Sequence, residues 1–246
     1  NLHIALLNGF VPTVGNSYTI LTYASFSGAF SSVSPSCWTV HYGPTSTYVT
    51  YNPPAEICDG LDNDCDGQID EGVEHPDYAA LMALYNATDG ANWTDNTGWG
   101  ATPCDVCGWY GVGCDVNGRV VSIELIDNNL TGAIPPEIGD LANLTELDFQ
   151  INQLTGPIPT ELGNLTNLYF VALGNNQLSS NIPASFANLS NLEVLDLSIN
   201  QLAGSIPVGL GGLGGLKTLL LNENQLTGPI PAALGNLSNL DYLALN

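Results

Sequence analysis

Residues 144–159 read Leu144-Thr-Glu-Leu147-Asp-Phe149-Gln-Ile-Asn152-Gln-Leu154-Thr-Gly156-Pro-Ile158-Pro159. The same order of apolar residues around one asparagine recurs along the second half of the chain. The central asparagines lie 24 residues apart, at Asn128, Asn152, Asn176, Asn200 and Asn224. A fixed period of this length indicates a solenoid, in which each unit covers its apolar side only by stacking on the next unit.

The repeated asparagine is a polar residue at a position that the surrounding apolar pattern buries. A buried amide needs hydrogen-bond partners, so we expect each of these side chains to bond backbone atoms of the neighbouring turn. The sequence therefore predicts a ladder of asparagine side chains that runs through the stack.

The repeats resemble the plant-type leucine-rich repeat, and the resemblance covers residues 120–246 as five full repeats and a truncated sixth. It implies a mainly β solenoid with 24-residue repeats, short strands on the concave side and 3-10 or loop structure on the convex side. In this family Gly-x-Ile-Pro, here Gly156–Pro159, turns the chain from one side to the other. Ser180 stands where the pattern expects glycine, and we expect this departure to leave the fold intact.

Residues 75–119 precede the repeats and carry a different pattern. Pro76 suits the start of a helix, with Asp77 in the first turn. Apolar residues at helical spacing predict a short amphipathic helix over 77–86; they are Tyr78, Leu81, Met82 and Tyr85. Together with Cys107-Gly-Trp-Tyr-Gly-Val-Gly-Cys114, this helix resembles the N-terminal cap of such solenoids, particularly bacterial ones. The resemblance implies a Cys107–Cys114 disulfide and a cap that closes the open end of the core.

Residues 1–52 are poor in charge and rich in Tyr, Thr, Ser, Val and Phe. Three stretches of this composition predict strands; they are Tyr18–Tyr23, Cys37–Tyr42 and Thr47–Tyr51. Residues 9–30 resemble the closing part of β-solenoid domains of bacterial surface proteins, which implies a secreted bacterial origin. A small β segment with open edges is expected to need a neighbour.

Residues 53–74 form a linker with an acidic loop, Cys58-Asp-Gly-Leu-Asp-Asn-Asp-Cys-Asp-Gly-Gln-Ile-Asp-Glu71. Alternating carboxylates and a turn-forming glycine wrap oxygen atoms around one point, and Ca²⁺ takes about six to eight oxygen ligands. The expected ligands are Asp59, Asp62, Asp64, Asp66, Asp70 and Glu71, together with the backbone carbonyl of Gln68. We expect this calcium loop to fix the angle between the β segment and the cap.

The loop resembles the metal-binding Cys-Asp-Gly-x-Asp-Asn-Asp-Cys-Asp-Gly repeat of bacterial surface proteins, and also the first half of an EF-hand loop. It departs from the EF-hand because the twelfth position is Val73 rather than glutamate. The alternative is a solvated acidic linker that a disulfide closes. Five aspartates this close together repel one another unless a cation neutralises them, which favours the metal site.

The chain contains six cysteines. An even number in mostly loop-like contexts suggests disulfides and an oxidising compartment. Besides the bridge in the cap, we expect Cys58–Cys65. The pairing of Cys37 with Cys104 follows by elimination.

The net charge is −22, from 24 acidic residues against two basic ones, Arg119 and Lys217. Nucleic acids are bound through Lys and Arg side chains that neutralise phosphates, so we exclude nucleic-acid binding and disfavour anionic membranes. No apolar run approaches the roughly 20 residues of a membrane helix, so we expect no membrane span. Metal cations, neutral glycans and basic partners remain as ligand classes.

Catalytic motifs are missing from the sequence, which has no Gly-x-Ser-x-Gly, no His-Glu-x-x-His and no phosphate loop. Glu124 and Asp148 fall at the same repeat position, and paired carboxylates cleave glycosides in some enzymes. We expect this pair on an open surface, without the cleft that raises the pKa of an acid. The sequence therefore predicts a protein that is not an enzyme.

We expect an extracellular or cell-surface binding module that contacts a protein or glycan through outward-facing positions of the concave strands. The candidate contacts are Glu124, Glu146, Asp148, Phe170, Val194, Asp196, Thr218 and Tyr242, and the other outward positions include Ala172, Gly174 and Ser198.

Two other functions are open at this point. One is a structural stalk, adhesin or filament subunit that self-associates end to end through its uncapped last repeat and its β edges. The other is ice binding, because some plant antifreeze proteins are 24-residue leucine-rich repeats. Ice binding needs a flat ladder of identical Thr or Asn, which the varied concave positions do not supply.

Overall fold

The computed structural model describes residues 2–3, 13–22, 33–34, 37–52, 54–59, 61–63, 69–70 and 72–245. The chain forms two compact units, Asn1–Glu74 and His75–Asn246. The boundary between these units falls where the sequence places the start of the cap. Within the described residues, no helix is long and apolar enough to cross a membrane.

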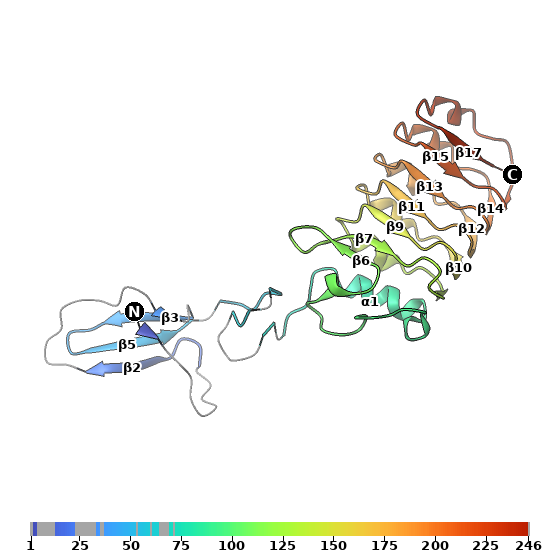
Figure 1. Ribbon diagram of the computed structural model, residues 1–246. Helices are drawn as coiled ribbons and strands as arrows, with labels where there is room; N and C mark the ends of the chain where they lie inside the picture. The colour runs from blue at the N-terminus through green and yellow to red at the C-terminus, as the bar shows by residue number, and fades with distance from the viewer. Residues whose placement is uncertain are drawn as a thin grey trace. The chain divides into compact units, whose positions relative to one another are not determined.

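The first unit contains two small sheets (Figure 1). The short strands β1 (Leu2–His3) and β3 (Val33–Ser34) pair in parallel. An antiparallel sheet has the order β2 (Ser17–Thr22), β5 (Ser46–Tyr51) and β4 (Trp38–Tyr42).

The antiparallel sheet follows from the alternation of residues in β5. Thr47, Val49 and Tyr51 are buried while the residues between them are half-buried, which is the period of two expected of a strand with one covered face. Tyr51 packs on Trp38 with ring centroids 5.1 Å apart. The β-solenoid resemblance rests largely on residues 9–12 and 23–30, which lie outside the described residues.

The second unit begins with the cap. Its elements are α1 (Tyr78–Ala87), the 3-10 turns η1 (Gly90–Asn92) and η2 (Val106–Gly108), and β6 (Val112–Cys114). Leu81 and Leu84 of α1 are fully buried. Beside them, Trp99 lies 4.8 Å from Trp93 and 5.0 Å from Trp109 between ring centroids. These aromatic rings close the end of the core with a large apolar area.

The sequence predicts Asp77 in the first turn of the helix, but the structure places this residue just before the helix. The helix begins at Tyr78, and Asp77 makes no side-chain capping bond. Its carboxylate instead accepts hydrogen bonds from Arg119 Nη2 at 2.5 Å, from Arg119 Nε at 3.0 Å and from the N–H of Val120 at 2.9 Å. Burial raises the pKa of Asp77, but these bonds and the charge of Arg119 outweigh it and lower the pKa below its usual value.

The repeats build a seven-stranded sheet, referred to below as the concave sheet, in the order β6-β7-β9-β11-β13-β15-β17 (Figure 1). Its repeat strands are β7 (Val120–Glu124), β9 (Glu146–Asp148), β11 (Phe170–Ala172), β13 (Val194–Asp196), β15 (Thr218–Leu220) and β17 (Tyr242–Ala244). They are parallel, and Phe170 pairs with Glu146 on one side and Val194 on the other. Residues at one repeat position therefore form a row across the sheet.

A second parallel sheet has five strands. They are β8 (Thr131–Gly132), β10 (Gln153–Pro157), β12 (Gln177–Asn181), β14 (Gln201–Gly204) and β16 (Gln225–Leu226). Each repeat then makes one 3-10 turn: η3 (Pro136–Asp140), η4 (Thr160–Asn164), η5 (Ala184–Asn188), η6 (Val208–Gly212) and η7 (Ala232–Asn236). The solenoid that the period predicts, and the mainly β structure that the leucine-rich-repeat resemblance implies, are confirmed.

The core is continuous from the cap through the repeats. In the second repeat, Leu147, Phe149, Leu154 and Leu162 are all fully buried. Equivalent positions in the neighbouring repeats are buried as well, so each unit covers the apolar side of the next.

The predicted asparagine ladder is present. Asn176 Nδ2 donates to Phe149 O of the preceding repeat at 2.9 Å, and its Oδ1 accepts the N–H of Leu154 at 2.9 Å. The same pattern occurs at Asn152, Asn200 and Asn224. Asn128 extends the ladder into the cap, because its side chain donates to Asp95 O and accepts the N–H of Asp95.

Ser180 adopts the conformation of the glycine that it replaces. Its φ is 69°, close to the 75° of Gly156 and the 73° of Gly204 at the same repeat position. Side chains disfavour this left-handed region, so Ser180 adds local strain. Strand β12 nevertheless continues through it, and Ser180 pairs with Leu202 of β14.

Replacing Asn176 with leucine should lower the free energy of unfolding by about 1–3 kcal/mol, because the N–H of Leu154 would be buried without a partner and Phe149 O would keep only its bond from Asn152. Asn167→Leu is the matched control. Asn167 is exposed and donates one bond to the exposed Ala142, so water can replace its side chain. Urea denaturation measures both variants, and equal losses would contradict a special role for the ladder.

Candidate binding face on the concave sheet

Two rows of the concave sheet hold all eight expected contact residues. One row runs Glu146, Phe170, Val194, Thr218 and Tyr242, and the other runs Glu124, Asp148, Ala172, Asp196, Leu220 and Ala244. Each row takes one residue from each strand because the strands are parallel and in register. The residues are therefore neighbours on a single face.

This face is less exposed than the sequence suggested. Asp148 is only 9% exposed, and Ala172 and Ser198 are buried although both were expected to face outward. Phe170 is half-buried and Tyr242 is exposed. The reason is the strand spacing, because neighbours in a row stand about 4.8 Å apart and a large side chain covers a small one beside it.

Ala172, with its small side chain, lies between Asp148 and Asp196 in one row, and Gly174 follows it along the chain. A Cβ at Gly174 would lie 2.9 to 3.1 Å from the carboxylate atoms of Asp196, so the absence of a side chain there makes room for that carboxylate. Gln150 Nε2 reaches past Gly174 and donates to Asp196 Oδ2 at 3.3 Å. We refer to Asp148, Ala172, Gly174 and Asp196, with Gln150 on the rim, as the acidic notch.

Asp148 is buried among like charges. Burial raises the pKa of Asp148 above its usual 3.8 and outweighs the hydrogen bond from the N–H of Gln150, which lowers it; the carboxylates of Glu124 and Asp196 add to the rise. The expectation that this carboxyl stands in water with an ordinary pKa was wrong. The physical cause is the burial of the side chain in a row that also holds the carboxylates of Glu124 and Asp196.

The two basic side chains of the chain are both paired with other carboxylates. Arg119 binds Asp77 in the cap, and Lys217 Nζ lies 2.6 Å from Glu193 Oε2. The acidic notch therefore has no cation from this chain to balance it.

Tyr169 belongs to the same surface, although sequence reasoning missed it. Its hydroxyl donates a hydrogen bond to Glu146 Oε1 on the neighbouring strand. This bond, with burial and nearby carboxylates, raises the pKa of Tyr169 to about 12. The sequence does carry a signal for Tyr169. Its repeat position varies as much as the two rows of expected contact residues, and it holds Thr145, Tyr169, Glu193 and Lys217.

A hollow of about 350 Å³ continues the face onto the cap. Tyr110 and Val112 from the cap line it together with Ser122 and Glu124 of β7. Tyr110 is 40% exposed. An aromatic side chain and a carboxylate therefore border the end of the sheet beside the acidic notch.

The acidic loop is only partly described. Asp59, Asp62 and Asp70 are among the described residues, whereas Asp64, Asp66, Gln68 and Glu71 lie outside them. In the described part of the chain, no three His, Cys, Asp or Glu side chains are grouped so that they could hold a metal ion. The ligand set expected from the sequence stays a prediction.

The described part of the loop folds back on itself. The N–H of Asp59 donates to Asp70 Oδ1 at 3.0 Å, and the N–H of Asp70 donates to Glu56 Oε2 at 3.1 Å. Asp59 also accepts the N–H of Leu61 at 2.9 Å. These bonds bring the two ends of the acidic loop together, so that carboxylates from its start and its end lie close.

The cysteines of the described residues are all in disulfides. Cys107 is joined to Cys114, the pair that the cap motif implies. Cys37, Cys58 and Cys104 are disulfide-bonded as well. The pairs Cys58–Cys65 and Cys37–Cys104 stay predictions, and Cys65 lies outside the described residues.

Two family models of the leucine-rich repeat match the chain, over residues 143–165 and 166–226. The leucine-rich-repeat ectodomain of the receptor kinase SOBIR1 from Arabidopsis thaliana is 30% identical with a TM-score of 0.60, over 70% of this chain and 92% of that ectodomain. The chain belongs to the leucine-rich-repeat family. A separate family model, described as a metal-binding motif and named for copper binding, matches residues 50–71.

Other solved structures share the repeats. A plant ice-binding protein is 38% identical with a TM-score of 0.63, over 69% of this leucine-rich-repeat chain and 55% of that chain. A second structure is the ectodomain of the Arabidopsis receptor kinase HAESA in complex with an N-terminal extended IDA peptide hormone ligand. It is 32% identical with a TM-score of 0.54, over 69% of this chain and 32% of that ectodomain. The chain thus spans about half of the first and a third of the second. A comparison with curated proteins gives no match.

Asp148→Asn should raise the free energy of unfolding near neutral pH and change it little below the ordinary carboxyl pKa of 3.8. A carboxyl with a raised pKa holds its proton more tightly when folded. The protonated Asp148 carboxyl therefore stabilises the folded state at low pH. This stabilisation is lost as the pH rises through the pKa of the unfolded state and then that of the folded state. Urea denaturation between acidic and neutral pH measures the difference.

Asp77→Asn is the control with the opposite sign. The pKa of Asp77 is lowered, so its contribution is present at neutral pH and is lost as the pH falls through the folded pKa. The free energy of unfolding of that variant should be lower than that of the parent protein at neutral pH and should approach the parent value in acid. An Asp148→Asn protein that is no more stable than the parent at neutral pH would contradict the account of the notch.

Proposed function

We propose that this chain is an extracellular binding module whose concave face takes a basic segment of a peptide or protein. The observation that carries the proposal is the acidic notch, in which Asp148 and Asp196 lie on either side of Ala172 in one row of the sheet. A Lys or Arg side chain that reaches these two carboxylates would form charge-assisted hydrogen bonds and offset the like charge that adds to the raised pKa of Asp148.

The side chains around the notch favour a peptide over a glycan at this place. Phe170 and Val194 lie side by side next to it, and Tyr169 adds an exposed aromatic ring. Aromatic residues close to a few buried charges are typical of the energetically important centre of protein interfaces. The peptide bound to the HAESA ectodomain supports a ligand of this class.

An extracellular location is proposed on two grounds. The SOBIR1 and HAESA structures are of receptor-kinase ectodomains. The Cys107–Cys114 bond and the other disulfide-bonded cysteines suit an oxidising compartment.

We propose binding rather than catalysis at this face. Glycoside cleavage uses two carboxyl groups that flank the bond to be broken, one of them protonated. Asp148 has a raised pKa, but Glu124 is paired with it directly on the adjacent strand. The two side chains stand next to each other in one row and leave no room for a sugar ring between them.

For the acidic loop we propose a calcium site formed by the aspartates from Asp59 to Asp70, the Gln68 carbonyl and Glu71. Oxygen donors suit Ca²⁺, whereas copper favours nitrogen and sulfur ligands. The sulfur of Cys58 is in a disulfide and is therefore a poor ligand. The contact between Asp59 and Asp70 supports a loop that closes around one point.

Ice binding is a second candidate because one repeat position on the second sheet is always glutamine. Gln153, Gln177, Gln201 and Gln225 are exposed, and the repeats are similar to those of a plant ice-binding protein. In the register of this sheet they pair with Thr131, Thr155, Ser179 and Ala203 rather than with one another, so identical side chains do not form one row. Gln side chains also lose more conformational entropy than Thr when they are held on a lattice, so this function ranks below peptide binding. Assembly into a stalk, adhesin or filament also stays a proposal.

The peptide proposal is tested by selecting binders to the full chain from a random peptide display library. Selected peptides should contain Lys or Arg close to an aromatic or aliphatic residue. The double variant Asp148→Asn, Asp196→Asn should lower their affinity at least about tenfold, and Phe170→Ser should cost about 1–3 kcal/mol of binding energy, as expected for an interface anchor.

The matched control is Glu137→Gln, Glu161→Gln, which removes the same charge from the 3-10 turns η3 and η4. This control should leave the affinity almost unchanged in moderate salt, because screening limits distant charges. Peptides without basic residues, or equal losses for both double variants, would remove the notch as the binding site.

The metal proposal is tested by titrating the chain with Ca²⁺ and, separately, with Cu²⁺ in a calorimeter. We expect calcium uptake that Asp64→Ala, Asp66→Ala abolishes. Calcium at 100 times its dissociation constant stabilises the loop by about 2.7 kcal/mol, so chelation should raise protease cleavage within residues 56–74. The melting of the repeats should stay unchanged, because their core is separate from the loop. Uptake of copper but not of calcium would contradict the assignment.

A further inference from the structure

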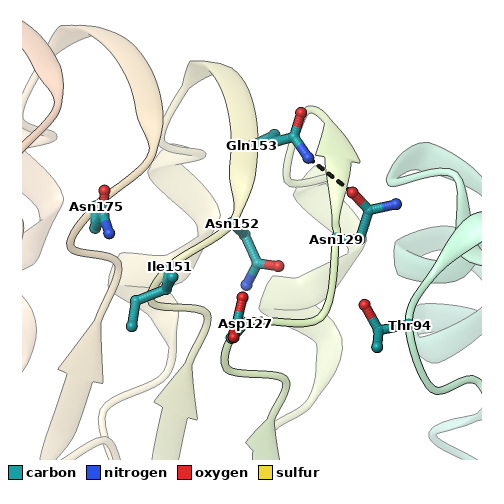
Figure 2. Close-up of a pocket in the computed structure, with 7 residues that line it drawn as sticks. All are labelled: Thr94, Asp127, Asn129, Ile151, Asn152, Gln153 and Asn175. Atoms are coloured by element: carbon teal, nitrogen blue, oxygen red, sulfur yellow. Dashed lines mark hydrogen bonds between the residues drawn. The ribbon is translucent and has the colours of Figure 1, made fainter.

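A polar cavity of about 380 Å³ lies beside the turns that follow the first concave strands. Figure 2 shows its lining, with Asn129 and Gln153 joined along one rim, Thr94 on the side of the cap, and Asp127 below Asn152. The volume is within the range of small-molecule sites, roughly 300–1,000 Å³. None of the expected contact residues of the concave face contributes to it.

The wall on the cap side is fixed by the end of the asparagine ladder. The N–H of Thr94 donates to Asn128 O at 3.0 Å, and Asn129 Nδ2 donates to Asn92 O at 2.8 Å. Asn129 Oδ1 in turn accepts Gln153 Nε2 at 2.7 Å. Thr94, Asn129 and Gln153 are therefore held in place before any ligand arrives.

The opposite wall is fixed by backbone bonds between successive turns. The N–H of Asp127 donates to Gln150 O at 3.0 Å, and the N–H of Asn175 donates to Ser198 O at 2.9 Å. Asn152 uses its amide within the ladder, where Nδ2 donates to three carbonyl groups. Its side chain therefore acts as a rigid part of the lining rather than as a free ligand group.

The remaining side chains keep their hydrogen-bonding capacity. Within the described part of the chain, the side chains of Thr94, Asp127 and Asn175 have no hydrogen-bond partner, and one donor position of Gln153 is unused. Together they offer a hydroxyl, a carboxylate and amide groups that both donate and accept. Ile151, which is 47% exposed, adds an apolar surface at the edge.

We propose that this cavity binds a neutral sugar unit of an oligosaccharide. Each sugar hydroxyl both donates and accepts a hydrogen bond, which matches the mixed donors and acceptors of Asp127, Asn175 and Gln153. The apolar C–H face of a sugar ring packs on a side chain such as Ile151.

Other ligand classes fit the cavity less well. An anion would meet the carboxylate of Asp127 and no basic side chain. A divalent cation would find a single carboxylate where several charged oxygens are usual. A basic side chain is better satisfied on the concave face, where two carboxylates, Asp148 and Asp196, lie in one row.

The test is binding of cellohexaose, chitohexaose and mannohexaose to the full chain, measured by saturation-transfer-difference NMR and calorimetry at millimolar concentration. We expect at least one of them to bind. Asp127→Gly and Asn175→Gly should each weaken that binding about tenfold, the effect of losing one good hydrogen bond. Both residues have positive φ, 49° and 56°, so glycine preserves the turn.

Glu223→Gly is the matched control. Glu223 occupies the same turn position in a later repeat with φ of 55°, and it does not line the cavity. This variant should bind the oligosaccharide like the parent, and thermal melting verifies that all variants fold. Absence of binding by all three oligosaccharides, or binding that the Asp127→Gly, Asn175→Gly double variant retains, would overturn the proposal. So would loss of sugar binding on Phe170→Ser, which alters only the concave face.

Discussion

Each repeat has to satisfy one buried amide, and the way in which it does so governs the rest of the solenoid. Asn176 bonds Phe149 O and the N–H of Leu154 in the preceding repeat, so two successive turns are held at one offset along the chain. An insertion between two asparagines would displace these partners and leave buried polar groups unpaired. The same offset sets the strand register of the concave sheet, in which Phe170 pairs with Glu146 and Val194. The rows of side chains at both proposed sites follow from that register.

A fixed register lets the surface change one residue at a time while the core stays constant. At the third repeat, Ala172 and Gly174 place a small side chain and no side chain on the face, and the carboxylate of Asp196 occupies the space beside Gly174. The cost is the burial of a carboxyl among like charges, which raises the pKa of Asp148. The solenoid tolerates this cost because the apolar residues beneath, such as Leu147 and Val171, remain fully buried. A binding face can thus be less stable than its surroundings without disturbing the stack.

The solenoid and its asparagine ladder could be predicted because both depend on residues that recur at a fixed spacing. The 24-residue period from Asn128 to Asn224 is visible in the sequence itself. Contacts between distant residues could not be read in the same way. Asp77 was expected in the first turn of the helix, but it lies just before the helix and its side chain binds Arg119, 42 residues away. Asp148 was expected in water, but only 9% of it is exposed, because its exposure depends on side chains of neighbouring repeats that the period does not specify. For the acidic loop, the spacing of the aspartates predicts a metal site. The identity of the ion depends on the number and arrangement of ligand atoms around it, which the spacing along the chain does not specify.

The turn after each concave strand bears on how the polar cavity should be interpreted. This turn takes positive φ in every repeat, a conformation that Asp and Asn tolerate and that is unfavourable for β-branched residues. Ile151 and Ile199 nevertheless adopt it, at φ of 57° and 52°. Strain by itself does not mark a site, because Ile199 is strained in the same way and does not line the cavity. The cavity is set apart by its second wall. The cap loop stands against the first repeat and places Thr94 opposite the turn residues. The junction of cap and repeats therefore forms an open hollow with two walls, from residues that later repeats present without a second wall.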